Sequence, residues 1–406
     1  MSGVISDNTV RSSGQVAPLS SSTLDASNPA VDTNPTDGVG TKWVNTTSGQ
    51  IFICTDATTD ANHWIGQTGT ALVGPRCIWA GGNSDNADEH NAATAVKINE
   101  VSFIVPTTLG NATDFGDLLE TNQYFAGTSN GTNERGIFAG GYDSSSPSEV
   151  VQYITCSSAG NATDLGNLSE AMGGPGASSN ATSDRASFSG GNRASIPPNY
   201  DRASDMIQYI TISSAGNATD SGNLTSARDY TCGTDNGTDD RGINAAGRLD
   251  GGVSGNTNSI NYWTISSTGN AAAFGTLTGA RFKPWTASSD TNNRGLFGGG
   301  ELAGTANPSN NIEYITISST GNGTSFGDMA GATPSGYPDY SGGRGNMYGS
   351  SSGTGERGLY AGGYTSGPNW YKQIEYVTIS STGNSTSFGD LSKRAYGKSG
   401  CSNTFG

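Results

Sequence analysis

One short motif recurs six times along the chain and constrains its fold more than any other feature. Each copy is a Gly-Asn pair that follows a stretch rich in Ser and Thr, and consecutive copies lie 50 to 62 residues apart. An aromatic residue stands seven positions before the marker glycine in every copy, and another glycine stands six positions after it. The marker glycines are Gly110, Gly160, Gly216, Gly269, Gly321 and Gly383. Repeats of this length are typical of folds built from one supersecondary unit.

Each repeat predicts four short β-strands. The run from Ile312 to Ile317 combines β-branched and aromatic residues, which favour a strand, and the Ser-Ser-Thr-Gly-Asn after it favours a turn. A short outer strand follows that turn. A second apolar run opens with an arginine and mostly ends in Gly-Gly, and a strand of small residues precedes the arginine. Four short strands in each repeat, with six repeats, predict a β-propeller.

The repeated arginines are interpreted as structural residues that pair neighbouring blades, because one occurs in every repeat. They are Arg76, Arg135, Arg185, Arg241, Arg294 and Arg357.

The two ends of the repeat region predict a closed ring. The chain stops 23 residues after Gly383, just short of where another arginine would stand, and Arg76 lacks a well-matched strand before it. The strand around Tyr396 to Asn403 is therefore expected to pair into the first blade, which removes the open sheet edges. Together with 61 glycines and few helix formers, this predicts an all-β fold with a six-bladed propeller over residues 71–406.

The first seventy residues differ from the repeats. Residues 1–40 are rich in Ser, Thr, Asn and Asp without an apolar period, which predicts an extended arm that becomes ordered only against another protein. In residues 41–70 two apolar runs flank a Thr-Ser-Gly turn, which predicts a small β-hairpin module that Trp43 and Trp64 stabilise. A plain linker is the alternative interpretation of this region.

The repeat unit resembles a known family. The paired glycines after one strand and the aromatic residue in the next resemble kelch repeats. The unit Ile-x-Tyr-Ile-Thr-Ile-Ser-Ser-Thr-Gly-Asn, with its Phe-Gly-Asp-Leu continuation, is similar to kelch-like propellers of tailed bacteriophages, notably marine cyanophages. The module at 41–70 likewise resembles one found in phage fibre and tail proteins. The resemblance implies a virion protein made in the host cytoplasm and located on the exterior of the tail or capsid.

Charge and residue counts argue against several functions. The net charge of −15 disfavours binding to nucleic acid or to anionic membranes, and no apolar run is long enough to span a membrane. The only histidines, His63 and His90, are too far apart for a credible catalytic or metal site. We expect no cofactor, no metal and no enzymatic activity. The acidic turn from Asp235 to Asp240 suits calcium by composition, but it lacks the EF-hand pattern and is interpreted as a plain turn.

Loop length varies after the Gly-Gly pairs and before Arg344, whereas the Ser-Ser-Thr-Gly-Asn turn is constant. In a four-stranded blade both variable connections emerge on one face, and variable loops on a rigid scaffold are common binding sites. Aromatic residues in these loops suit stacking on sugar rings, although ordinary loop packing is the alternative. The candidate ligand-binding residues are Tyr142, Tyr200, Trp285, Tyr337, Tyr340, Tyr364, Trp370 and Tyr371.

These observations lead to one main hypothesis. The protein is expected to be a non-enzymatic tail-fibre or tail-associated propeller that attaches to other virion proteins through residues 1–70. Its variable face would bind a host cell-surface receptor, a glycan or a protein. The alternative is a structural or decoration protein that docks other phage proteins without a receptor role, and a glycan-cleaving enzyme is a weaker third hypothesis. The propeller needs no partner to fold, yet fibre proteins are often trimers, so an oligomer is compatible with the sequence.

Overall fold

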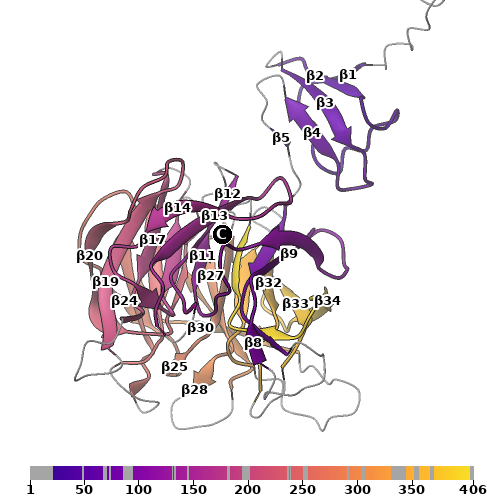
Figure 1. The fold of residues 1–406 in the computed structure, drawn as a ribbon. Coiled ribbons are helices and arrows are strands. Elements are labelled where there is room, and N and C mark those ends of the chain that lie inside the picture. Colours follow the sequence, from indigo (N-terminus) through magenta and orange to yellow (C-terminus); the bar gives the residue numbers. More distant parts are fainter. Residues whose placement is uncertain are drawn as a thin grey trace, which may run out of the picture. The chain divides into compact units, whose positions relative to one another are not determined.

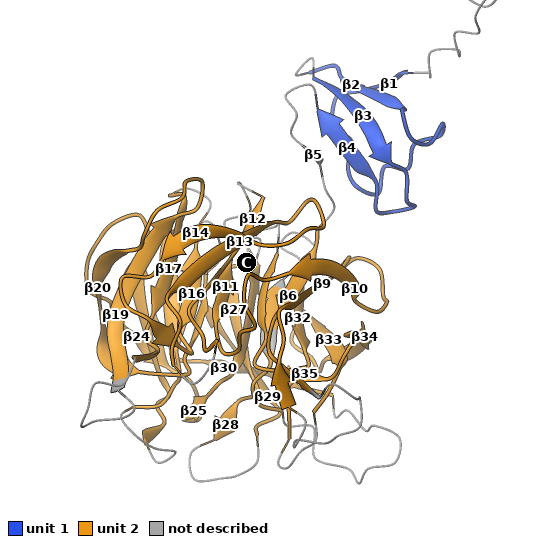
Figure 2. Ribbon diagram, viewed as in Figure 1, with its two compact units in different colours: residues 1–74 blue, residues 75–406 orange. Residues whose placement is uncertain are grey.

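The chain divides into two compact units. In the computed structural model, unit 1 comprises residues 1–74 and unit 2 comprises residues 75–406 (Figure 2). The structure describes residues 22–47, 50–66, 71–72, 75–85, 95–129, 131, 134–143, 146–180, 183–193, 202–235, 237, 239–249, 255–289, 292–302, 308–330, 344–351, 356–365 and 370–402. Every regular element in these ranges is a strand, which confirms the prediction of an all-β protein (Figure 1).

Unit 1 is a five-stranded sheet in the order β1-β2-β3-β4-β5. Its strands are β1 (Ser22–Asp25), β2 (Lys42–Asn45), β3 (Ile51–Asp56), β4 (His63–Gly66) and β5 (Ala71–Leu72). Phe52, Cys54 and Trp64 are buried on one side of the sheet, and Trp43 packs edge-to-face on Trp64 with 6.0 Å between ring centroids. The small core of this unit therefore consists of Phe52, Cys54 and Trp64, with the half-buried Trp43 packed against it.

The sheet of unit 1 begins earlier than the sequence indicated. Strand β1 lies inside the segment that we expected to be an extended arm, and it pairs in parallel with β2. Main-chain pairing accounts for the difference, because an edge strand whose four residues are all exposed needs no apolar pattern to hydrogen-bond to its neighbour. Residues 1–21, the rest of the expected arm, lie outside the described residues.

Unit 2 contains six copies of one four-stranded antiparallel path, which we call the repeat sheets and number by repeat. The strand that begins at the repeated arginine pairs antiparallel with the strand that carries the repeated aromatic residue. In β32 and β33, for example, Leu359 pairs with Tyr376, and Ala361 pairs with Ile374. In the third repeat the path belongs to a larger, six-stranded sheet.

In path order, the first repeat sheet is β36 (Ser399–Ser402), β6 (Cys77–Ala80), β9 (Glu100–Ile104), β10 (Thr113–Asp117); the second is β11 (Ala126–Thr128), β12 (Arg135–Ala139), β13 (Val150–Thr155), β14 (Thr163–Asn167); the third is β16 (Gly176–Ser179), β17 (Arg185–Ser189), β19 (Arg202–Thr211), β20 (Thr219–Arg228); the fourth is β21 (Cys232–Thr234), β22 (Arg241–Ala245), β23 (Ser259–Thr264), β24 (Ala272–Thr276); the fifth is β26 (Trp285–Ser289), β27 (Arg294–Gly298), β29 (Asn311–Thr316), β30 (Thr324–Asp328); and the sixth is β31 (Tyr348–Ser351), β32 (Arg357–Ala361), β33 (Gln373–Thr378), β34 (Thr386–Asp390).

Unit 2 also contains short additional strands, of which β7, β18 and β28 directly follow paired glycines. They are β7 (Asn83–Asp85) with β8 (Ala95–Lys97) and β35 (Ala395–Tyr396), β15 (Met172–Gly173) with β18 (Asn192–Arg193), and β25 (Arg281–Phe282) with β28 (Glu301–Leu302). In Figure 1, β8, β25 and β28 lie at the same end of unit 2.

The apolar core lies between consecutive repeat sheets. Ile78 and Phe115 of the first sheet share a cluster with Phe138 of the second, for example. Trp79 of the first sheet likewise packs in a cluster with Phe388 of the sixth. The first and last repeats are therefore neighbours in space.

The C-terminal strand completes the first repeat sheet. Strand β36 pairs antiparallel with β6, and Cys401 lies opposite Ile78. The first strands of the six paths also contact one another in sequence: β11 contacts β36 and β16, β21 contacts β16 and β26, and β31 contacts β26 and β36. We call these six strands the cavity-lining strands, since the cavity described below runs between them.

Each repeated arginine connects two repeats. Its guanidinium donates to a backbone carbonyl of the next repeat, as in Arg135 to Ile212 at 2.6 Å, and lies over the aromatic ring of its own repeat, as with Tyr153 at 4.2 Å. In the sixth repeat the acceptor is the carbonyl of Pro106 in the first repeat. The five other arginines make the same two contacts.

The marker Gly-Asn pair forms a second connection between repeats, which accounts for its recurrence in the sequence. The Asn161 side-chain oxygen accepts a hydrogen bond from the Asp117 N–H at 3.0 Å, and the Gly160 N–H donates to the Phe115 carbonyl at 2.7 Å. The turn of one repeat therefore covers part of the free edge of the outer strand before it. Gly116, in that outer strand, is needed because a Cβ there would lie 2.4 Å from the Gly160 carbonyl oxygen.

Candidate functional site

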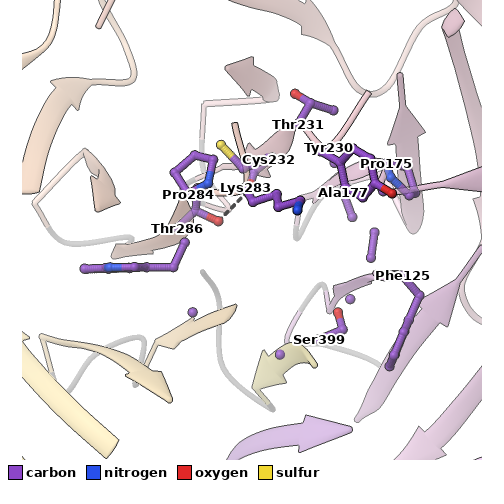
Figure 3. Close-up of a pocket in the computed structure, with 18 residues that line it drawn as sticks. Phe125, Pro175, Ala177, Tyr230, Thr231, Cys232, Lys283, Pro284, Thr286 and Ser399 are labelled. Atoms are coloured by element: carbon purple, nitrogen blue, oxygen red, sulfur yellow. Dashed lines mark hydrogen bonds between the residues drawn. The ribbon is translucent and has the colours of Figure 1, made fainter. Parts of the chain in front are cut away.

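A cavity runs between the cavity-lining strands. A first pocket there has an empty volume of about 500 Å³, including the space open to solvent. A second pocket shares with the first one small or short residue from each of the six strands: Gly127, Ala177, Gly233, Thr286, Gly349 and Gly400. Glycine is required where the strands approach most closely, since a Cβ on Gly349 would lie 1.7 Å from the Thr286 carbonyl oxygen. Figure 3 shows the first pocket, which Phe125, Tyr230 and Lys283 also line.

Two residues before each cavity-lining strand, the backbone adopts a left-handed conformation with φ between 46° and 70°. The residues at this position, which we call the entry position, are Tyr124, Gly174, Tyr230, Lys283, Asn346 and Gly397. Main-chain hydrogen bonds connect neighbouring members: the Lys283 N–H donates to the Tyr230 carbonyl at 2.9 Å, and the Gly174 N–H donates to the Tyr124 carbonyl at 2.7 Å.

Glycine adopts the left-handed conformation without a steric penalty, whereas other residues pay roughly 1–2 kcal/mol. Two of the six entry positions carry glycine. Tyr124, Tyr230 and Lys283 carry large side chains in the same backbone conformation, so something other than backbone preference accounts for their presence.

A second position contacts the first. It is the residue directly after each Gly-Gly or Ala-Gly pair: Asn83, Tyr142, Asn192, Arg248, Glu301 and Tyr364. These residues form short antiparallel bridges with the chain just before the cavity-lining strands, as Tyr142 does with Gln123 and Tyr364 does with Gly345. Their side chains are thereby held next to the entry positions.

The side chains of the two positions, together with Tyr396, form what we call the mouth cluster: Tyr124, Tyr142, Tyr230, Arg248, Lys283, Glu301, Tyr364 and Tyr396. The rings of Tyr124 and Tyr230 meet edge-to-face with centroids 5.3 Å apart. Tyr124 also meets Tyr142 at 6.4 Å and Tyr396 at 6.1 Å, and Tyr364 meets Tyr396 at 5.6 Å. Each of these five tyrosines is half-buried, so the cluster keeps aromatic surface open to solvent.

Two cations lie within this aromatic surface, and each has a carboxylate partner. The Lys283 ammonium is 4.9 Å from the ring centroid of Tyr230 and 5.3 Å from that of Tyr124, and it contacts the Glu301 carboxylate at 3.3 Å. The Arg248 guanidinium makes two hydrogen bonds to Asp229, at 2.9 and 2.7 Å. Charges at the mouth are therefore balanced in pairs.

Burial shifts the proton affinities of two members of the mouth cluster. It lowers the pKa of Lys283, which the carboxylate of Glu301 partly offsets. It raises the pKa of Tyr364, and the same carboxylate raises it further, because the Tyr364 hydroxyl donates to Glu301. Glu301 thus holds both the ammonium and the hydroxyl in place.

The second pocket carries an acidic group. Asp235 is buried there, and its carboxylate accepts a hydrogen bond from the Ser179 N–H at 2.8 Å. Burial raises the pKa of Asp235 to about 7. Within the described ranges, no group of three or more His, Cys, Asp or Glu side chains is arranged to hold a metal ion.

Three of the candidate ligand-binding residues predicted from sequence lie at the mouth. Tyr142 and Tyr364 belong to the mouth cluster, and the Trp370 ring packs on Tyr396 with 4.9 Å between centroids. Trp370 is only 5% exposed, so it offers little surface to a ligand and packs against Tyr396 instead. Tyr371 is also buried, and its hydroxyl lies 3.4 Å from the Thr365 hydroxyl.

The prediction that Trp285 lies in a variable loop is wrong. Trp285 is the first residue of strand β26, it is 1% exposed, and its ring stacks on Tyr360 with centroids 4.4 Å apart. Its indole fills the space that Gly298 leaves on the neighbouring strand. Tyr200, Tyr337 and Tyr340 lie outside the described residues.

Several members of the mouth cluster were not identified from the sequence: Tyr124, Tyr230, Arg248, Lys283, Glu301 and Tyr396. One signal was available. The residue after each glycine pair varies between repeats from Asn and Tyr to Arg and Glu, although the glycine directly before it is the same in all six, and Arg248 and Glu301 stand at that position. The entry position carries no such signal, because its left-handed backbone is visible only in the fold.

The chain was compared with family models and with curated proteins, and neither comparison finds a match. Among the described residues no helix is long and apolar enough to cross a bilayer.

Proposed function

We propose that unit 2 is a closed six-bladed, kelch-like β-propeller, and that the protein is a non-enzymatic virion protein of a tailed phage that binds a host-surface glycan at the mouth cluster. The observation that carries the binding proposal is the mouth cluster itself: aromatic rings and paired charges from five repeats contact one another, and two of its members, Tyr230 and Lys283, line the first pocket.

Three sets of contacts support the closed propeller. Strand β36 pairs with β6, Arg357 donates to the Pro106 carbonyl, and β31 contacts β36. Each of these joins the last repeat to the first in the way that the other repeats join their successors. A ring of six such sheets leaves no repeat with an unpaired neighbour.

The chemistry of the mouth cluster supports a glycan ligand. Half-buried tyrosine rings offer flat apolar surfaces, and the hydroxyls and paired charges beside them offer hydrogen-bond donors and acceptors. Ligand sites commonly combine an apolar lining with a few converging polar groups. Pyranose rings present both an apolar face and hydroxyl groups, so they match this combination.

Attachment to the virion is assigned to unit 1. Leu24 and Ile53 are 68% and 43% exposed there, although both are aliphatic. Exposed aliphatic side chains on a small sheet suit contact with another protein. The proposal therefore separates attachment by unit 1 from receptor binding by unit 2.

An adsorption experiment tests this function. Host cells are incubated with an excess of the purified full-length protein before phage is added, and the rate of phage adsorption is measured. We expect the protein to bind the cells and to slow adsorption, whereas bovine serum albumin at the same concentration has no effect. A protein that neither binds cells nor slows adsorption would overturn the receptor proposal and favour a structural or decoration role.

A further inference from the structure

We propose that Tyr124, Tyr230 and Lys283 determine what the mouth cluster binds, and that its ligand is a neutral hexose unit, bound by ring stacking and by hydrogen bonds to its hydroxyls. This inference rests on the proposed function and deepens it, because it names the specificity-determining residues and the chemical class of the sugar.

The argument begins with the backbone at the entry position. All six repeats impose the same left-handed conformation there, and Gly174 and Gly397 show that glycine fits the position. Tyrosine and lysine are disfavoured in this conformation, most of all when the side chain is bulky. Side chains that persist against the backbone preference indicate a role for the side chain itself.

The three side chains also converge. Although Tyr124, Tyr230 and Lys283 come from three different repeats, the Lys283 ammonium lies near both tyrosine rings, and the two rings contact each other. Tyr230 and Lys283 line the cavity, and Figure 3 shows the Lys283 side chain extending toward Tyr230 and Ala177. Their placement therefore concentrates aromatic and hydrogen-bonding groups at one point of the opening.

The charge balance of the mouth selects the ligand class. Lys283 is paired with Glu301, and Arg248 is paired with Asp229. A charged sugar would have to compete with one of these partners and leave the displaced group uncompensated, which is unfavourable at a half-buried site. A neutral sugar leaves both pairs intact and can hydrogen-bond to their outer atoms.

A structural role makes a different prediction from a binding role. If the three side chains only fill the mouth, their removal should destabilise the fold. If they are kept for a ligand, replacement by glycine should relieve backbone strain and leave stability unchanged or increased, while binding is lost. Substitution at the entry position therefore separates the two roles.

The test uses the full-length protein and the variants Tyr124→Gly, Tyr230→Gly and Lys283→Asn, the last being the residue of the sixth repeat at this position. Thermal unfolding is measured first. Binding is then measured on a printed panel of neutral oligomers of glucose, galactose and mannose, beside oligomers of uronic acids. The matched control is Glu134→Gly, which also replaces a left-handed residue but lies outside the mouth cluster.

We expect Tyr124→Gly and Tyr230→Gly to unfold within about 2 °C of the wild type or above it. Lys283→Asn leaves Glu301 without its ammonium partner, so this variant is expected to unfold at a lower temperature and is compared for binding only. We also expect the affinity of each variant for the neutral oligomers to fall by roughly tenfold or more. Glu134→Gly should bind as the wild type does. Variants that retain binding, or tyrosine variants that unfold more than about 5 °C lower, would overturn the inference in favour of a structural plug.

The failure of this inference and that of the proposed function are distinguishable. A wild-type protein that binds host cells but only uronic acid oligomers on the panel, or no neutral oligomer, overturns the neutral hexose class and leaves the receptor role intact. A wild-type protein that binds no cells overturns the receptor role.

Discussion

The side-chain oxygen of Asn111 accepts a hydrogen bond of 3.0 Å from the backbone N–H of Asp390, which lies 279 positions later in the chain. The same contact joins all five remaining pairs of consecutive repeats, for example Asn161 with Asp117. An asparagine that recurs for reasons of turn chemistry in the sequence thus also covers a strand edge in the neighbouring repeat. The turn motif therefore also connects each repeat sheet to the one before it.

Replacing Asn111 by alanine tests the contribution of this contact. Asn111→Ala removes the acceptor for the Asp390 N–H, so we expect the free energy of unfolding to fall by about 0.5–1.5 kcal/mol. Urea unfolding followed by fluorescence measures it. Asn111→Asp keeps an acceptor oxygen in the same place and should retain most of the stability; equal losses in both variants would show that the hydrogen bond is not the cause.

Gly166 and Gly216 provide a matched pair for testing the close approach between repeats. A Cβ on Gly166 would lie 2.2 Å from the Gly216 carbonyl oxygen, and φ there is +142°. We expect Gly166→Ala to destabilise the protein by roughly 1–3 kcal/mol. Gly216→Ala meets nothing within 4 Å and should change stability by less than about 0.5 kcal/mol. Urea unfolding of both variants decides the matter, and a similar loss at both positions would contradict the packing described above.

Removal of residues 396–406 tests the role of the C-terminal strand. The truncation deletes β36 and leaves the edge of β6 without its partner, so we expect aggregation or loss of the cooperative unfolding transition. Size-exclusion chromatography and thermal unfolding measure the result. A control chain that ends at Ser402 keeps β36 and should behave as the full-length protein. A soluble, fully folded 1–395 fragment would refute closure by the C-terminal strand.

Asp235 makes stability depend on pH. Its folded pKa of about 7 lies above the ordinary value of 3.8, so the folded state favours the protonated acid. The resulting stabilisation is fully present below the unfolded pKa and is lost as pH rises through the folded pKa. We therefore expect Asp235→Asn, which stays neutral, to gain stability relative to the wild type between about pH 4 and about pH 8, by up to a few kcal/mol. The free energy of unfolding of both proteins is measured by urea unfolding at several pH values. If its dependence on pH is the same for the wild type and for Asp235→Asn, Asp235 does not titrate in this way.

Arg228 is buried without a carboxylate partner among the contacts described. Its guanidinium lies 3.4 Å from the Asn261 side-chain oxygen, whereas Arg281 and Arg344 bond to Glu313 and Glu375 at the equivalent strand position. Burial lowers the pKa of Arg228 to about 10.

Asn261→Glu supplies the missing carboxylate and is expected to raise the free energy of unfolding by about 1–3 kcal/mol. Asn261→Gln has the same length without the charge, and it controls for the added volume in this tightly packed place. Thermal and urea unfolding of the two variants are compared directly. If the glutamate variant is no more stable than the glutamine variant, the charge on Arg228 is already compensated.

Most of the strand architecture could be predicted from the sequence, because it depends on local patterns. Runs such as Ile312 to Ile317 carry β-branched and aromatic residues, and the Ser-Ser-Thr-Gly-Asn turns carry residues that favour turns. Both signals lie within a few residues, and the sixfold repetition reinforces them. Strand β1 was missed because its pairing with β2 depends on main-chain hydrogen bonds that leave no apolar pattern.

The site depended on the tertiary structure. Tyr124, Tyr230 and Lys283 are separated by many strands in sequence, and only the packing of successive repeat sheets brings them to one opening. Their left-handed backbone runs against residue preference, so no local rule predicts it. Trp285, by contrast, is aromatic like Tyr124 and Tyr230 but lies two residues further along its repeat, where the strand direction turns it into the core. The amino-acid sequence alone determined the repeated strands and turns; the tertiary structure decided which side chains meet, because that depends on contacts between residues far apart in the chain.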